Sequence, residues 1–233
     1  MTTLIEAAGL SAGYGRMAVV RDLDLKVDPG EVVALIGANG AGKTTTLLTL
    51  AGELSPLAGE VRFLGSPTKA PMHTRCRQGL GYVTEERSVI MDLSIADNLK
   101  LAGVPAATAF EFFPSLERLM DRKAGLCSGG EQQMLSLARA LGREPKVLLA
   151  DELSLGLAPI IVTNLLKAVR AAADERGIGV LLVEQHVRQA LKIADRVYVM
   201  ERGKVVVSGT VAEVEGQIDR IEAAYLTGGT ATA

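Results

Sequence analysis

Short apolar runs alternate with helical segments through most of the chain. Two segments, 128–143 and 160–176, are predicted as helices, the first with Met134, Leu137 and Leu141 on one face. The short apolar runs that read as buried strands lie at 32–36, 147–150 and 180–183, and 197–200 and 205–207 are predicted as strands on either side of a turn. Because apolar strands that alternate with helices build a parallel sheet covered on both faces, the pattern predicts an α/β fold.

The N-terminal part of the chain has a different pattern. Residues 4–8, 19–27 and 59–64 are predicted as strands, and positions 22–27 alternate polar and apolar with a period of two. We expect these strands to form an antiparallel piece beside the parallel core.

A stretch from 93 to about 123 is predicted to be helical, with interruptions at Pro105 and Pro114, because proline lacks the amide that a helix interior needs. With the helix that follows, it is expected to form a helical lobe at about 93–145, inserted in the core. A single domain is predicted for 1–226, and a flexible tail for 227–233.

The composition narrows the class of protein. Of 233 residues, 48% are hydrophobic, 22% charged and 3% aromatic, with a net charge of −2. This balance argues against a nucleic-acid partner, which calls for basic patches or aromatic stacking platforms. No apolar run approaches the length of about 18 residues typical of a membrane span, and no signal peptide is expected. The two cysteines, Cys76 and Cys127, are far apart and are predicted to be reduced thiols.

The strand at 32–36 leads into a phosphate-loop motif, G-x-x-x-x-G-K-[ST]. A loop between a strand and a helix N-terminus can turn several amides toward one anion, which predicts a nucleotide site. Lys43 is expected to bind the outer phosphates, and Thr44 to bind Mg²⁺. A glycine-rich turn without a ligand is the alternative. The predicted nucleotide-binding residues here are Gly37, Ala38, Asn39, Gly40, Ala41, Gly42, Lys43, Thr44 and Thr45.

Two carboxylates follow the apolar strand at 147–150. Asp151 is predicted to hold Mg²⁺, directly or through water, and Glu152 to polarise a water in line with the γ-phosphate. The alternative is an acidic pair at the start of a surface turn.

The helix at 128–143 opens with a second candidate phosphate site, formed by Ser128, Gly129, Gly130 and Glu131. A capping box of Ser128 and Glu131 explains the helix start without any ligand. However, such a box does not need two consecutive glycines, each of which costs a helix about 1 kcal/mol.

Two further residues are candidates on weaker grounds. His186 follows the strand at 180–183 and can approach the γ-phosphate as a hydrogen-bonding sensor, although a loop or core histidine is the common case. Tyr14 can stack on adenine, although a strand aromatic is about as good an interpretation.

In their order along the chain, these motifs resemble those of ABC-transporter ATPase subunits, and the resemblance extends from Tyr14 to Leu226. The segments 154–159, 183–186 and 224–226 are most similar to the shorter ATPase subunit of branched-chain (hydrophobic) amino acid importers. In that subfamily the usual loop glutamine is often glutamate, and Glu85 stands there in this sequence.

The resemblance implies the P-loop NTPase fold of ABC ATPases: a RecA-like parallel core, an antiparallel β piece and a short helical lobe. It implies that two subunits sandwich two ATP molecules head to tail, in a homodimer or a heterodimer with a paralogous ATPase subunit. Each site would pair Lys43, Thr44 and Glu152 of one copy with the 128–130 segment of the other. The loop at 155–157 would cross the dimer interface, and Glu85 would contact Mg²⁺.

The resemblance also implies two membrane permease subunits, an extracytoplasmic binding protein that acts indirectly, and a place on the cytoplasmic face of the membrane. Urea or amide importers and lipopolysaccharide exporters are alternatives. A non-transport ABC protein and a small-molecule kinase are more distant ones.

Three features depart from the family pattern. Leu153 stands where most ABC ATPases have proline, and Cys127 replaces the usual leucine or methionine before Ser128. The stretch between Asn98 and Cys127 is also shorter than the subfamily pattern.

Overall fold

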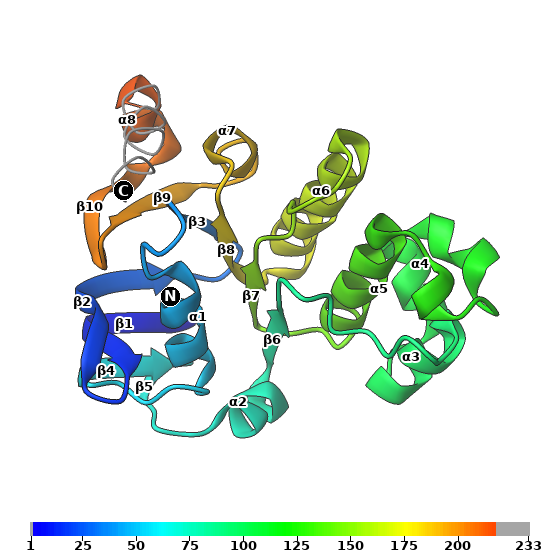
Figure 1. Cartoon of the computed structure of the whole chain (residues 1–233), viewed down its shortest axis with the longest axis horizontal. Helices are drawn as coiled ribbons and strands as arrows, with labels where there is room; N and C mark the ends of the chain where they lie inside the picture. Colours follow the sequence, from blue (N-terminus) through cyan, green and yellow to red (C-terminus); the bar gives the residue numbers. More distant parts are fainter. Residues whose placement is uncertain (1, 218–233) are drawn as a thin grey trace, which may run out of the picture.

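The computed structural model describes residues 2–217, which form two sheets with helices packed around them (Figure 1). The larger sheet has six strands, all parallel to their neighbours except β10. Their spatial order is β10 (Lys204–Thr210), β9 (Arg196–Glu201), β3 (Val32–Gly37), β8 (Gly179–Glu184), β7 (Val147–Asp151) and β6 (Leu80–Val83). The predicted parallel core is therefore confirmed.

The smaller sheet is antiparallel, as predicted, with the order β2 (Met17–Val27), β1 (Ile5–Tyr14), β4 (Ala58–Phe63) and β5 (Ser66–Pro67). Helix α1 (Lys43–Ala51) lies between the two sheets. Its Leu47 and Leu50 share one apolar core with side chains from both.

Strand β3 explains why the core strands lack polar positions. Val33 and Leu35 face the core that contains α1, whereas Val32, Ala34 and Ile36 face a second core on the other side of the sheet. Both faces are covered, so every position is apolar and no alternation is visible in the sequence.

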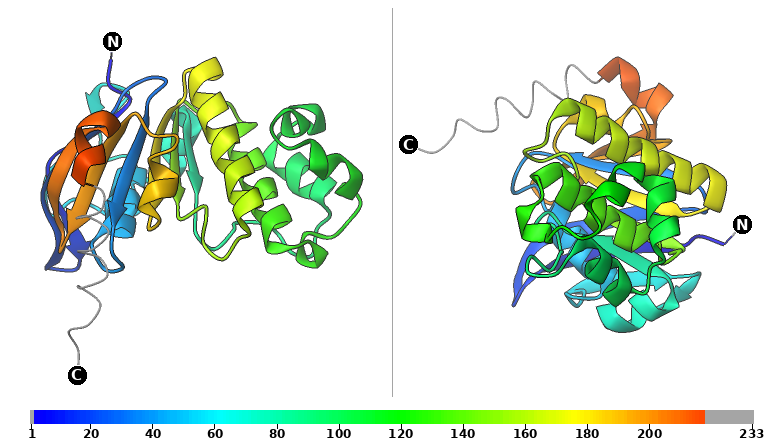
Figure 2. Two further views of the ribbon diagram at one scale, coloured as in Figure 1. Left: turned by 90° about the horizontal axis from the view of Figure 1, so that it is seen from above. Right: turned by 90° about the vertical axis from the view of Figure 1, so that its right-hand side faces the viewer.

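The second core is covered by α5 (Gly129–Leu141) and α6 (Pro159–Arg176). Figure 2 shows α3 and α4 grouped with α5 at the end of the molecule away from the small sheet. The lobe elements are α3 (Ile95–Ala102), α4 (Ala106–Phe112), η1 (Pro114–Leu119) and η2 (Ala124–Leu126). The breaks fall at Pro105 and Pro114, as predicted. The remaining helices are α2 (Met72–Gln78), α7 (Val187–Ala190), α8 (Val211–Val214) and η3 (Glu215–Gln217).

Some elements differ from the sequence-based prediction. Strand β1 continues to Tyr14 instead of ending at Ala8, because the pairing register shifts between Ala7 and Leu10 and this hides the alternation. Helix α2 was not predicted, since of its seven residues only Arg75 is buried. The predicted tail at 227–233, the domain end at 226 and the motif at 224–226 lie outside the described residues.

The turn between β9 and β10 supports the phosphate loop from outside. The amide of Gly203 donates to the carbonyl of Ala41 at 2.9 Å, and its own carbonyl accepts from Arg21 at 2.9 Å. Gly203 has a φ of +83°, and an added Cβ would lie 1.9 Å from the carbonyl oxygen of Val19. Only glycine fits here.

We expect Gly203→Ala to destabilise the chain by roughly 1–3 kcal/mol or more, because it adds a backbone clash to an unfavourable φ. Urea unfolding measures the change. Gly15→Ala is the matched control, since Gly15 also has a positive φ, of +61°, but nothing within 4 Å of an added Cβ. Equal losses in the two variants would mean that the close approach at Gly203 is unimportant.

Candidate functional site

Helix α1 begins without a side-chain cap. Gly42 is its N-cap, with a φ of 106° and no side-chain hydrogen bond to the helix. The first amides of a helix lack intrahelical partners, and the helix dipole makes this end positive. The strand–loop–helix arrangement predicted for the motif therefore presents unsatisfied donors to an anion.

Lys43 is the first residue of α1, and its side chain is only 4% exposed. Its Nζ donates to the carbonyl of Gly37 at 2.8 Å and to that of Ala38 at 3.4 Å. It also pairs with Glu152 Oε1 at 3.4 Å, and the Glu152 side chain is 12% exposed. The ammonium is thus held by the loop and by the acidic residue that follows β7.

A cavity of about 390 Å³ opens beside these residues. Eight predicted site residues line it: Asn39, Gly40, Gly42, Lys43, Thr44, Thr45, Glu85 and Glu152. Three further lining residues were not predicted as site residues: Val19, Leu155 and Gln185. Gln185 could have been found from its position directly after β8, next to His186.

Asp151 is not among the residues that line the cavity; it is 2% exposed at the end of β7. Its Oδ1 is buried without a hydrogen-bond partner. Burial raises the pKa of this carboxyl to about 6; a hydrogen bond from Thr44 opposes the rise, and Glu152 and Glu85 add to it. An unpartnered buried oxygen beside a hydroxyl fits a hard cation such as Mg²⁺.

Within residues 2–217, no three or more His, Cys, Asp or Glu side chains converge into a metal site of their own.

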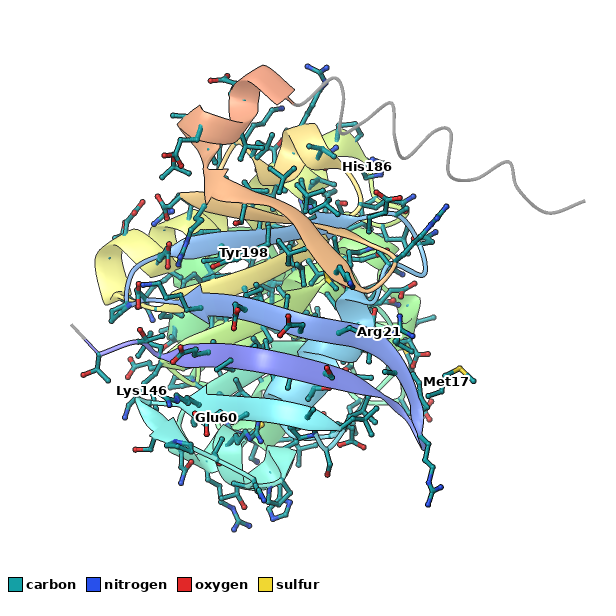
Figure 3. All side chains as sticks on the ribbon, turned by 90° about the vertical axis from the view of Figure 1, so that its left-hand side faces the viewer. Met17, Arg21, Glu60, Lys146, His186 and Tyr198 are labelled. Atoms are coloured by element: carbon teal, nitrogen blue, oxygen red, sulfur yellow. The ribbon has the colours of Figure 1, made fainter. Side chains whose placement is uncertain are left out.

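Tyr14 and His186 do not line the cavity. Tyr14 is 56% exposed at the end of β1, and His186 is exposed as the N-cap of α7. In Figure 3, His186 and Met17 lie toward the end of the sheet where the core strands β3 and β8 finish, and Lys146 toward the opposite end. The roles of Tyr14 and His186 stay predictions.

The 128–131 segment does not line the cavity either. Its capping box is formed: the Ser128 hydroxyl accepts from the Glu131 amide at 3.3 Å, and the Ser128 amide donates to Glu131 Oε2 at 2.7 Å. The Ser128 hydroxyl also donates to Glu131 Oε2 at 2.9 Å. Within one chain this helix start is therefore already capped.

The two glycines that follow have a packing role. A Cβ at Gly129 would lie 2.8 Å from Nη1 of Arg87, and one at Gly130 would lie 3.0 Å from Cγ2 of Ile161. Gly130 therefore lets α6 pack closely against α5. Gly129 leaves room for the Arg87 guanidinium, which comes from the loop that also carries Glu85.

The departures from the family pattern have structural counterparts. Leu153 is 1% exposed in the second core, so packing fixes this position. Cys127 is 8% exposed, and its Sγ donates to the carbonyl of Lys123 at 3.6 Å.

Glu184, the last residue of β8, was missed by the sequence analysis and is 1% exposed. Burial raises the pKa of its carboxyl to about 7; hydrogen bonds from Ser154 oppose the rise, and Glu152 and Asp151 add to it. An acidic residue at the end of an otherwise apolar strand was the signal that could have found it.

Comparison with known proteins identifies the family. The family model described as ABC transporter matches residues 20–154. The chain belongs to the ABC transporter family. BraG, the high-affinity branched-chain amino acid transport ATP-binding protein of Pseudomonas aeruginosa, is 41% identical in an alignment of 229 residues that covers 94% of this chain and 97% of BraG. The lipopolysaccharide export system ATP-binding protein LptB of Acidithiobacillus ferridurans is 40% identical, over 92% of this chain and 93% of LptB.

Solved structures agree with the fold. An ATP-binding subunit of an ABC transporter matches with a TM-score of 0.82 at 28% identity, covering 96% of this chain and 100% of that one. A dimeric bacterial ABC transporter cassette matches with a TM-score of 0.79 at 23% identity, covering 89% and 99%.

ABC ATPases bind and hydrolyse ATP, so this ABC chain is an ATPase. Cassettes of the family work as dimers with membrane permease components. From residue 2 to residue 217, no helix of this ABC subunit is long and apolar enough to cross a membrane.

We expect the free energy of unfolding of Glu184→Gln, measured relative to that of the parent chain, to increase as the pH rises from about 5 to about 8. A carboxyl whose pKa rises on folding from 4.5 to about 7 contributes full stability below pH 4.5, and this contribution is lost as the pH rises through 7. Glutamine does not ionise, so it escapes this loss.

Urea titrations across this range measure the effect, which should reach up to about 1.4 kcal/mol per pH unit. Glu201→Gln, at an exposed carboxylate, is the control for loss of a surface charge. If the difference in unfolding free energy between Glu184→Gln and the parent does not change with pH, the raised pKa of Glu184 is contradicted.

Proposed function

We propose that this chain is the nucleotide-binding subunit of an ABC importer for branched-chain or other amino acids. Mg²⁺-ATP closes a head-to-tail dimer, and hydrolysis resets it. The observation that carries the nucleotide site is the meeting of Lys43, Glu152 and the uncapped start of α1 at one cavity. One cation, one candidate base and a set of free amides are what phosphoryl transfer to water needs.

The phosphate loop, Gly37 to Thr45, is proposed to bind the ATP phosphates through its amides. Lys43 would exchange the carbonyls of Gly37 and Ala38 for phosphate oxygens, because an anion competes well for a buried ammonium. Tyr14, exposed at the end of β1, is proposed to stack on the adenine.

Thr44, Asp151 and Glu85 are proposed to hold Mg²⁺, and the unpartnered Asp151 Oδ1 supports this assignment. When bound, Mg²⁺ would neutralise charge on the β- and γ-phosphates.

Glu152 is the proposed base. Its ion pair with Lys43 holds it in place in the single chain. Phosphates that take over Lys43 would release the carboxylate to orient and polarise a water in line with the γ-phosphate. His186, which follows β8, is proposed to sense the γ-phosphate and hold that water in line.

A second copy, or a paralogous ATPase subunit, is proposed to supply the 128–131 segment to each site. Ser128 donates to Glu131 within the chain, so closure would exchange that bond for one to phosphate. This explains why the segment does not line the cavity of its own chain. The loop at 155–157 is proposed to cross the interface, and Leu155 is 43% exposed there.

The proposed partners are two membrane permease subunits at the cytoplasmic face and, indirectly, an extracytoplasmic binding protein. The cargo assignment is supported by the similarity to BraG and by the motifs at 154–159 and 183–186. The similarity to LptB makes lipopolysaccharide export the main alternative, followed by urea or amide import.

We expect Glu152→Gln to abolish Mg²⁺-dependent ATP hydrolysis, because the variant can bind ATP but cannot polarise water. Phosphate release should fall by about a hundredfold or more, and an ATP-bound dimer should accumulate on a sizing column. Glu117→Gln, at an exposed lobe carboxylate, should behave as the parent. Hydrolysis at the parent rate by Glu152→Gln would rule out the proposed base.

For the cargo, we expect cells that carry only the Glu152→Gln allele to lose uptake of labelled leucine. Leucine uptake should fall to the level of a deletion strain, with Glu117→Gln cells unchanged. Normal leucine uptake would refute the amino acid assignment. Loss of urea uptake alone would favour the amide importer, and accumulation of unexported lipopolysaccharide the exporter.

A further inference from the structure

Glu184 ends β8 in the middle of the large sheet, between β7 and β3. It is 1% exposed. Burying a carboxylate costs several kcal/mol unless it is well paired, and Glu152 and Asp151 add like charge nearby. An apolar side chain of similar size would be cheaper to bury, so stability alone does not account for an acid here.

Both carboxyl oxygens bind one residue. Glu184 Oε1 accepts the Ser154 amide at 3.1 Å, and Oε2 accepts the Ser154 hydroxyl at 2.5 Å. Ser154 is itself buried, at 5% exposure, so both bonds are shielded from water. We call these two bonds the Glu184–Ser154 clamp.

The clamp acts on the segment that follows β7. Glu152 has a φ of 47°, a left-handed conformation that is unfavourable for a residue other than glycine. Its amide donates to the carbonyl of Val183 at 2.9 Å, and its carbonyl accepts from Leu155 at 3.2 Å. The end of β8 therefore holds this strained turn twice, once through Val183 and once through the clamp.

The turn determines where two cavity residues point. From this turn the Glu152 carboxylate reaches Lys43, and Leu155, at the other end of the turn, lines the same cavity. Between them, Leu153 is anchored in the second core. Relaxation of the turn would move the carboxylate and the exposed loop together.

We propose that Glu184 is a positioning residue for ATP hydrolysis, and that its clamp on Ser154 sets the position of the Glu152 carboxylate. The inference rests on the proposed role of Glu152 as the base and extends it to a residue that does not line the nucleotide cavity. Glu184 acts through Ser154 and touches no reacting atom, so its loss lowers turnover rather than ATP affinity.

The test is a comparison of Glu184→Met with Glu184→Gln in steady-state ATP hydrolysis. Met removes both acceptors and is easier to bury than a carboxylate, although it leaves the Ser154 amide and hydroxyl unpaired. The kcat of Glu184→Met should fall about tenfold or more, with KM for ATP within about twofold, because a displaced base loses efficiency steeply. Gln keeps one acceptor and adds a donor, so it should restore kcat to within about threefold.

Ser154→Ala tests the same clamp from the other side and should reproduce the fall in kcat. Because the two residues act as a unit, the double variant should be no worse than the poorer single one. Ser136→Ala, at another buried serine, is the matched control and should retain parental kcat. If Glu184→Met fails to fold, Ser154→Ala carries the test, and parental kcat there overturns the proposal.

Glu152→Gln is assayed in parallel. If it hydrolyses ATP like the parent, the proposed base is wrong and the positioning role falls with it. If Glu152→Gln is inactive but Glu184→Met folds and keeps the parental kcat, the proposed base stands and only the positioning role of Glu184 is wrong. If kcat falls in Glu184→Met and is not restored in Glu184→Gln, the positioning role is also contradicted. The negative charge of Glu184, and not its hydrogen bonds to Ser154, would then be the essential feature.

Discussion

The site depends on one buried cation. The Lys43 ammonium is almost fully covered, and burying such a charge costs several kcal/mol unless partners replace its water. Its partners come from the loop after β3 and from Glu152 after β7. These strands are not neighbours, because β8 lies between them. The pairing therefore requires β3, β8 and β7 to be parallel and to end at one edge, which is the main feature of the larger sheet.

The two helix N-termini of the proposed composite site differ in capping: one has no side-chain cap and the other is capped. Helix α1 begins at Gly42, which offers no side-chain cap, so its amides are ready for an anion. Helix α5 begins at Ser128, whose hydroxyl and amide are already bonded to Glu131. A capping interaction is worth about 1 kcal/mol. In the proposed dimer, the start of α1 would therefore be ready for phosphate in the single chain, whereas the start of α5 would first have to give up its internal bonds.

Much of this arrangement could be predicted from sequence because the signals are local. The phosphate loop, the capping box and the doubly buried strand β3 each depend on a few adjacent residues. The rest depends on contacts between distant segments. The register shift near Ala7 hid the second half of β1, and the bond from Glu184 to Ser154 spans 30 positions. Gln185 lines the cavity because β8 lies beside β3, and its place directly after an apolar strand was the local signal for it.

The position of β3 in the sheet has a consequence for biosynthesis. Its two neighbours are β8 and β9, which end at Glu184 and Glu201, and its loop is fastened at Ala41 by Gly203. The loop itself is complete by residue 45. On the ribosome, the N-terminal antiparallel sheet can pair early, because its strands are close in sequence. Strand β3 must instead wait for β8 and β9 to emerge before both of its neighbours are present, so ATP cannot serve as an early template for folding.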